Sequence, residues 1–576
     1  MSSRRCSIRL TVMAVCVAAL MGCAPGAVSP RGDVAPGVTA KPKVLNVGVT
    51  TQLALMGVFA GQSTGGWTTL IELHSAGLIT ADVATPRPIG RLAERVPSLD
   101  DGSISILPDG RMRVVYRLRR DVTWQDGTPF TANDLVFSHK FLVDPGLPVT
   151  LKETAAKIQA VEAVDDWTAA LIFAQPYFLG NVLGPRELWP QPRHLLGDPY
   201  DRYVATGNAD EVQNLSYWTS TYINLGPFRV TSFDPGEEGV TFQAYEGYFL
   251  GRPKLDTIRV RAFRDENTLF ANLLAGAMDL FPGPALHADL ALQLKERWDA
   301  NGEGTVHVLL GTTSFLAPQW RPGVQSEPAN LDVRARQALY QAIDRESLPE
   351  EVKPAWSVLP PGDRFYEATT DGLRRYPYDP ARSRAILQDL GWSPGPDGIL
   401  RHNSDGRRYQ NRVSTTATGR LWEVATYADA WRRIGIEVEE AQIPAARARD
   451  LEFRALFPSW EASSSGQGDS ILGRLMGPAA SAQNRWSGNR GGYEDPVAQG
   501  LLGRYFSSIA ESDQFQAMRS LSEFMVSELP VLVSYYSTEH SGVRKGVRAL
   551  DDVSGGQHSS RAYGTYSRNA HLWDVE

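Results

Sequence analysis

The residues whose spacing best suits covalent chemistry are Gly61-Gln62-Ser63-Thr64-Gly65, which match the pattern G-x-S-x-G. In α/β-hydrolases this pattern forms a sharp turn that exposes the serine as a nucleophile, with a strand before it and a helix after it. Only residues 23–62 would precede Ser63 once the leader described below is removed, which is too little chain for the usual strands. The pattern therefore favours a glycine-rich loop, and a secreted serine hydrolase that uses Ser63 is the alternative.

Histidine and cysteine give no support for a metal centre. The nine histidines form neither an i, i+4 pair on an expected helix nor an H-E-x-x-H motif. All three cysteines, Cys6, Cys16 and Cys23, lie near the start of the chain, so the rest has no thiol for catalysis, for zinc or for a disulfide. We expect no catalytic residue, no metal and no cofactor.

The amino terminus has the features of an export signal. Arginines precede an apolar run at 10–21, which is too short to cross a bilayer but suits the core of a signal peptide. Leu20-Met21-Gly22-Cys23 resembles the bacterial lipoprotein box, in which cleavage leaves a lipid-modified cysteine. We expect a lipoprotein signal peptide at 1–22 and lipidation of Cys23, and several acyl chains would anchor the protein stably.

The segment that follows is rich in proline, glycine and alanine and cannot build a core. We expect 23–43 to be a flexible tether. An ordinary secretory signal with an incidental cysteine is the alternative.

Composition limits the remaining possibilities. The 576 residues are 42% hydrophobic and 21% charged, values typical of soluble globular proteins, which argues against a polytopic membrane protein or a disordered chain. The net charge of −7 argues against a nucleic-acid partner.

Several local patterns predict individual elements. Met112, Val114 and Tyr116 alternate with polar or smaller neighbours, which predicts a strand with one buried face after an Asp109-Gly110 hairpin turn. Thr131 and Asp134 occupy capping-box positions ahead of a helix at 132–142.

Other strands and helices alternate along the chain without a repeat, which predicts an α/β or α+β protein of large lobes. We expect strands at 44–49, 169–173, 228–233, 240–244, 257–262, 436–438 and 529–536, and helices at 67–76, 266–275, 333–343, 381–390, 421–434, 496–509 and 512–527.

Tryptophans beside glycine, serine, threonine or asparagine are candidates for enclosing a ligand, since aromatic rings near polar loop groups are typical of binding pockets. Burial in the core is the alternative for each of them. They are Trp67, Trp124, Trp167, Trp218, Trp460 and Trp486.

The stretch 118–138, which includes Trp124-Gln125-Asp126-Gly127-Thr128-Pro129, resembles the signature of the family-5 extracellular solute-binding proteins. This is the oligopeptide, dipeptide and nickel class that serves ABC importers. Further stretches between about 44 and 550 are similar to the same family in the same order. They are 88–94, 224–228, 251–256, 274–279, 332–339 with 342–345, 378–380, 484–488 and 529–531.

The resemblance implies an α/β, two-lobe periplasmic-binding-protein-like fold with a ligand cleft between the lobes. Lobe 1 would comprise 44–310 plus 530–576, with an inserted subdomain at about 80–215. Lobe 2 would comprise 311–529. The Asp-Gly-Thr-Pro motif would be scaffold, because its polar groups are needed for a turn and a cap.

Peptide-binding relatives pair the ligand backbone with a strand from each lobe. The resemblance places Thr51, Gln52 and Leu53 at the first-lobe strand and Trp460, Glu461 and Ala462 at the second-lobe strand. Three further candidate contacts are Asn484 and Trp486, from the matching stretch 484–488, and Trp67, from the tryptophans beside polar loop residues.

One departure concerns the ligand. Relatives that bind a peptide α-amine commonly read W-x-A-D where this chain has Trp460-Glu461-Ala462-Ser463, so the carboxylate that pairs with the amine is missing. Glu461 or Asp469 could replace it. Otherwise a capped or modified peptide, a sugar or a chelate is the better candidate.

The sequence thus predicts a monomeric, lipid-anchored receptor that closes over a small peptide or other small solute and delivers it to an ABC permease in the membrane, without covalent chemistry. A surface peptide sensor that is not coupled to a permease is a further alternative.

Overall fold

The computed structural model describes residues 41–50, 55–59, 67–82, 87–149, 153–233, 239–349, 352–361, 363–416, 420–448, 450–465, 470–548 and 565–576. The predicted signal peptide, Cys23 and Ser63 lie outside these residues, as do Thr51, Gln52 and Leu53. No helix in the described part of the chain is long and apolar enough to span a bilayer.

The strands are β1 (Val44–Val49), β2 (Ile79–Ala81), β3 (Pro88–Gly90), β4 (Ile104–Ile106), β5 (Met112–Arg117), β6 (Ile158–Asp165), β7 (Thr168–Phe173), β8 (Phe228–Phe233), β9 (Gly239–Ala244), β10 (Thr257–Ala262), β11 (Leu280–Phe281), β12 (Gly304–Pro318), β13 (Val352–Pro354), β14 (Trp392–Pro394), β15 (Leu400–His402), β16 (Gln410–Thr415), β17 (Glu437–Gln442), β18 (Trp460–Ser465), β19 (Leu532–Arg544), β20 (Val547–Arg548) and β21 (Asp574–Val575).

The α-helices are α1 (Ala132–Val143), α2 (Arg193–Thr206), α3 (Asp210–Gln213), α4 (Glu266–Leu274), α5 (Ala288–Asn301), α6 (Val333–Gln341), α7 (Tyr366–Thr370), α8 (Pro380–Asp389), α9 (Leu421–Arg432), α10 (Leu451–Ala455), α11 (Ser470–Met476), α12 (Pro496–Ser507) and α13 (Glu511–Glu528).

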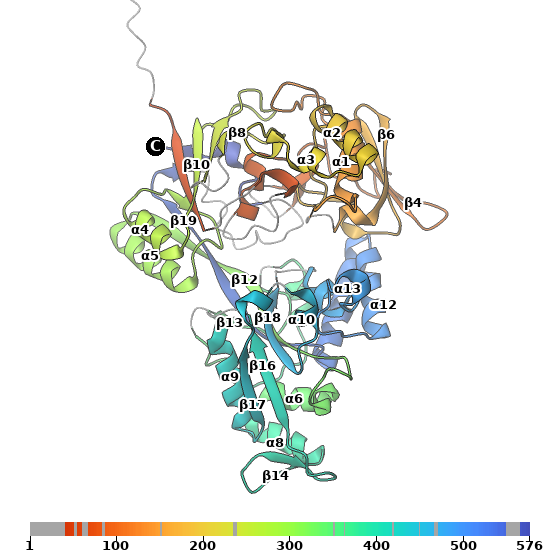
Figure 1. Ribbon diagram of the computed structural model, residues 1–576, viewed down its shortest axis with the longest axis vertical. Coiled ribbons are helices and arrows are strands. Elements are labelled where there is room, and N and C mark those ends of the chain that lie inside the picture. Colours follow the sequence, from red (N-terminus) through yellow and green to blue (C-terminus); the bar gives the residue numbers. More distant parts are fainter. Residues whose placement is uncertain are drawn as a thin grey trace, which may run out of the picture. The chain divides into compact units, whose positions relative to one another are not determined.

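Eleven strands of the described chain form one mixed sheet with the order β17-β16-β18-β12-β19-β11-β1-β10-β9-β8, and β13 also pairs with β19 (Figure 1). The antiparallel strands β12 and β19 occupy its centre. One end of β19 pairs with β11, while the other end of β12 pairs with β18. These two strands therefore belong to both halves of the sheet.

The pairing of β12 with β19 is interrupted by a register shift between Leu310 and Thr313. At this point the Thr312 amide donates to the Ser537 hydroxyl over 2.9 Å. The Ser537 hydroxyl in turn donates to the Thr312 carbonyl over 3.1 Å. A bulge of this kind locally bends and twists a strand pair.

Two of the hydrophobic cores lie on different sides of this bulge. One cluster contains Leu45, Trp218 and Trp573, and another contains Trp431 and Trp460. Separate cores joined by shared strands are consistent with two lobes. The boundaries given for the lobes and the inserted subdomain remain predictions.

The sequence patterns around the 118–138 motif predicted its elements well. Met112, Val114 and Tyr116 of β5 are buried while the residues between them are not, and the Asp109-Gly110 turn joins β4 to β5. Helix α1 begins with a complete capping box, since Thr131 donates its amide to Asp134 over 2.9 Å.

The same motif contacts a second matching stretch. The Gln125 side-chain amide donates to the carbonyls of Gly226 and Phe228, each over 2.9 Å, and its oxygen accepts from the Asn224 amide over 3.1 Å. Gln125 is buried. These contacts fix two loops to one another and agree with a scaffold role for the motif.

The predicted helix at 67–76 was wrong. The structure has two short 3-10 turns there, Trp67–Thr69 and Ile71–Leu73. Directly after these turns, Gly77 lies against the backbone of Gly184 and Pro185, where an added Cβ would come within 2.4 Å, so this position accepts no side chain. Hydrophobic spacing in the sequence does not contain this tertiary restriction.

Acid should destabilise the protein through His74. Its ring is buried among Trp189, Tyr222 and Phe242, and burial lowers its pKa from 6.5 to about 3. Between these values the unfolded chain binds more protons than the folded chain, so stability falls as the pH falls. At 1.36 kcal/mol for each pKa unit, the loss at about pH 4.5 relative to pH 7 is about 2 to 3 kcal/mol.

Urea unfolding of the wild type and of His74→Gln at both pH values tests this expectation. Between pH 7 and about pH 4.5, the free energy of unfolding of His74→Gln should fall by about 2 to 3 kcal/mol less than that of the wild type. Equal pH dependence in the two proteins would show that His74 does not cause it.

Candidate ligand-binding site

Strand β18 has a partly unpaired backbone edge. It pairs with β12 along its whole length, but with β16 only at Val413 opposite Trp460 and Ser414 opposite Glu461. Among the described residues, no strand pairs with 462–465 on the β16 side. An unpaired strand edge can accept an extended ligand through main-chain hydrogen bonds.

Successive residues of β18 point to opposite faces of the sheet. Trp460 and Ala462 lie in the hydrophobic core, where the Trp460 ring is 5.2 Å from that of Trp431. Glu461 and Ser463 occupy the other face. The structure therefore places Trp460 and Ala462 in the core, and their contact with ligand remains a prediction.

Glu461 is buried and paired with arginine. Its side chain is 2% exposed and accepts a hydrogen bond from Arg454, whose side chain is 10% exposed. Arg490 approaches the same carboxylate oxygen at 3.3 Å. Two guanidinium groups thus share one carboxylate.

Arg490 also donates to the Ser463 hydroxyl over 2.8 Å. Its side chain is 33% exposed, so part of the guanidinium remains open to solvent. Burial lowers the pKa of Arg490, an effect that Glu461 opposes and that the positive charges of Arg454 and Arg474 reinforce. The position that lacks the expected aspartate therefore lies beside a cation.

Arg321 positions the loop that carries Arg490. Its guanidinium donates to the carbonyls of Ala455 (2.9 Å), Ala480 (2.7 Å) and Arg490 (2.8 Å). This one side chain thus joins the segment at Arg321, the end of α10 and the loop 480–490.

A second cluster of polar side chains lies on the side of β18 that faces the hydrophobic core. Arg420 donates to both carboxylate oxygens of Glu423, at 2.6 and 2.7 Å, and to the Ser464 hydroxyl over 2.7 Å. Glu423 is buried and also accepts from Tyr535. Burial lowers the pKa of Arg420, but the hydrogen bonds and charge of Glu423 outweigh it, and the net change is upward.

The other predicted contacts have local roles. Trp67 is buried in the first core. Asn484 forms a capping box with Ser481 and donates to the Ala479 carbonyl over 2.8 Å. Trp486 is half-buried, with a positive φ of 57°. Their contact with ligand remains a prediction.

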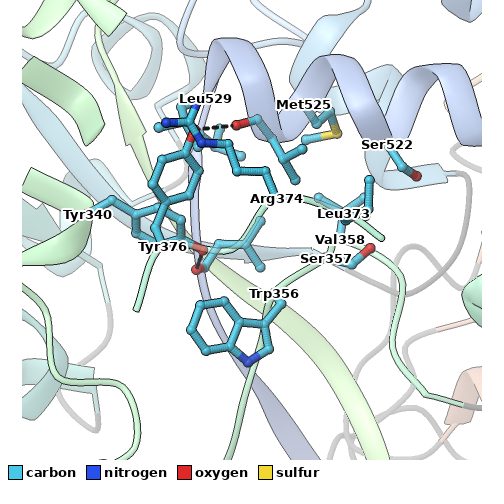
Figure 2. A pocket seen from close by; sticks show the side chains of 13 residues that line it. Tyr340, Trp356, Ser357, Val358, Leu373, Arg374, Tyr376, Ser522, Met525 and Leu529 are labelled. Carbon is cyan, nitrogen blue, oxygen red and sulfur yellow. Dashed lines mark hydrogen bonds between the residues drawn. The ribbon is translucent and has the colours of Figure 1, made fainter. Parts of the chain in front are cut away.

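Two cavities lie elsewhere in the second half of the chain. A cavity of about 540 Å³ is bordered by Trp320, Arg336, Tyr493 and Glu528, among others. Figure 2 shows a smaller cavity beside Tyr340, Trp356 and Tyr376. Its volume of about 20 Å³ is enough for about one water molecule.

Acidic, histidine and cysteine side chains do not gather into a candidate metal site of three or more within the described ranges. The site on β18 instead offers guanidinium groups, a serine hydroxyl and an open backbone edge. These groups can bind and orient a solute.

Comparison with known proteins identifies the family. The model for bacterial extracellular solute-binding proteins, family 5 Middle, matches residues 88–483. The oligopeptide-binding protein AppA of Bacillus subtilis is 24% identical, and the match covers 62% of this chain and just under two thirds (64%) of AppA. The dipeptide-binding protein of Escherichia coli is 22% identical, over 82% of this chain and 85% of that protein.

The fold is shared with solved structures. The oligopeptide-binding protein of Thermus thermophilus, in complex with a pentapeptide, superposes with a TM-score of 0.69 at 21% identity, covering 92% of this chain and 96% of that one. The predicted α/β fold of the periplasmic-binding-protein type is thereby confirmed. The chain belongs to the family 5 bacterial extracellular solute-binding proteins.

Proposed function

We propose that this protein is the lipid-anchored, extracytoplasmic substrate-binding protein of an ABC importer for peptides or related small solutes. Relatives named for oligopeptide and dipeptide binding support the ligand class. The apolar run at 10–21 and the box that ends at Cys23 support export and anchoring. The receptor acts as a monomer and returns its ligand unchanged.

The observation that carries the proposal is the open edge of β18. Residues 462–465 pair with β12 on one side, but on the β16 side they have no partner strand among the described residues, and the partly exposed Arg490 lies beside Ser463. A peptide-like ligand would continue the sheet through its main chain and place its end groups near these side chains.

The shared strands provide a mechanism for closure. The bulge at 310–313, opposite Ser537, separates the part of the β12–β19 pair in which β19 pairs with β11 from the part in which β12 pairs with β18. A few element residues that absorb backbone rotation are enough for a hinge. Phe178 packs against Tyr505 of α12 with ring centroids 4.9 Å apart, a contact between the predicted subdomain and the predicted second lobe that opening would separate.

One preparation tests both parts of the proposal. The full chain and its Cys23→Ser variant are expressed in a bacterial host that processes lipoproteins. The wild type should fractionate with membranes, and the variant should be released. The released protein is then used for thermal shift measurements with peptide and sugar pools, and for native mass spectrometry of any ligand it carries.

A ligand at 100 times its dissociation constant should stabilise the protein by about 2.7 kcal/mol. If no pool shifts the melting temperature and nothing co-purifies, solute binding is contradicted. If Cys23→Ser remains with the membranes, lipid anchoring at that residue is contradicted.

A further inference from the structure

We infer that Arg490 and Ser463 form a subsite for an anionic group of the ligand, such as a carboxylate, at the open edge of β18. The inference rests on the proposed function and deepens it by naming the ligand class. It predicts that a ligand end with a free ammonium group is disfavoured at this position.

The charged side chains beside Ser463 carry an excess of positive charge. Glu461 is an acidic group of this face, and buried Arg454 already pairs with it. Arg490 shares the same carboxylate oxygen at the longer distance of 3.3 Å. Two guanidinium groups against one carboxylate leave positive charge at the site, and the more exposed of the two is Arg490.

The Arg490 guanidinium has N–H donors that the described residues do not use. A guanidinium group carries five N–H donors. The hydrogen bonds of Arg490 to Ser463 and Glu461 both use Nη2, so Nε and Nη1 have no acceptor among the described residues. Each of these unused donors can give a charge-assisted hydrogen bond to a carboxylate oxygen.

Ser463 and Arg490 lie where a ligand paired to β18 would end. Ser463 belongs to the stretch 462–465 of β18. On the side of β16, the backbone of this stretch has no partner strand in the described chain. A ligand paired to that edge would bring one of its end groups next to Arg490. An ammonium group there would be repelled by Arg490, and the carboxylate of Glu461 is already shared by two arginines.

The experiment compares three versions of one tripeptide pool, with succinyl, acetyl or free amino termini, against the Cys23→Ser protein by calorimetry. The succinyl pool should bind at least about tenfold more tightly than the other two, the effect of one charge-assisted hydrogen-bonded pair. Arg490→Gln should remove this preference. The matched control is Arg504→Gln, an exposed arginine of α12, which should keep it.

A second variant neutralises the excess positive charge of the subsite without removing the arginine. Ser463→Asp would pair with Arg490, so the succinyl preference should fall by about tenfold or more, while free-amine peptides gain affinity. Circular dichroism melts confirm that each variant is folded before its affinity is measured.

Equal binding of the three pools, or tightest binding of the free amines, would overturn the anionic subsite and leave the receptor function intact. Failure of the succinyl pool to bind at all would also overturn it. Receptor function itself fails only if the protein carries no ligand and no solute pool shifts its melting temperature.

Discussion

Glu461→Gln should lower the free energy of unfolding by about 3 to 5 kcal/mol, because it leaves the buried Arg454 without its counter-ion. Arg454 and Glu461 have side chains that are 10% and 2% exposed, so water cannot replace the lost charge. Arg490 would lose the same partner. Urea unfolding followed by circular dichroism measures the effect.

The control is Glu523→Gln on α13. Glu523 pairs with Arg519 four residues away, but these side chains are 57% and 51% exposed, so the loss should be about 1 kcal/mol or less. Replacing both buried partners, as in Arg454→Met with Glu461→Leu, should be less damaging than Glu461→Gln alone. If Glu461→Gln unfolds like the wild type, the pair does not stabilise the fold.

Trp460→Ala should lower the free energy of unfolding by about 3 to 5 kcal/mol, the usual effect of emptying a buried tryptophan site. Trp460 is fully buried against Trp431. This expectation differs from the sequence-based one, in which Trp460 contacts ligand. Thermal and urea unfolding, with binding measured well below the melting temperature, separate the two roles.

Trp486→Ala provides the comparison, since this half-buried tryptophan lies in a loop. Its replacement should cause a clearly smaller loss of stability than that of Trp460. If Trp460→Ala instead melts like the wild type but no longer binds ligand, the core role is wrong and the ligand role is correct.

Local patterns in the sequence predicted the elements whose stability is decided locally. Strand β1 was predicted at 44–49, and the alternation around Val114 and the cap at Thr131 gave β5 and α1. Elements without such signals were missed. Strand β12 lacks a regular alternation because it passes from one core to the other, and α2 contains Pro199.

The candidate site was predictable only in part. The resemblance led to Glu461 and showed that Ser463 replaces an aspartate. It did not show Arg490, which lies 27 residues further along the chain and reaches Ser463 only through a loop that Arg321 holds in place. Nor could one strand's sequence show that its neighbour β16 stops short of 462–465.

The last residues of the chain complete the core that its first strand begins. Trp573 and Ala570 lie in the same hydrophobic cluster as Leu45, and the Thr565 hydroxyl donates to the buried Glu72 carboxylate over 2.9 Å. The first half therefore cannot complete this core until residues 565–573 have been synthesised and can pack against it.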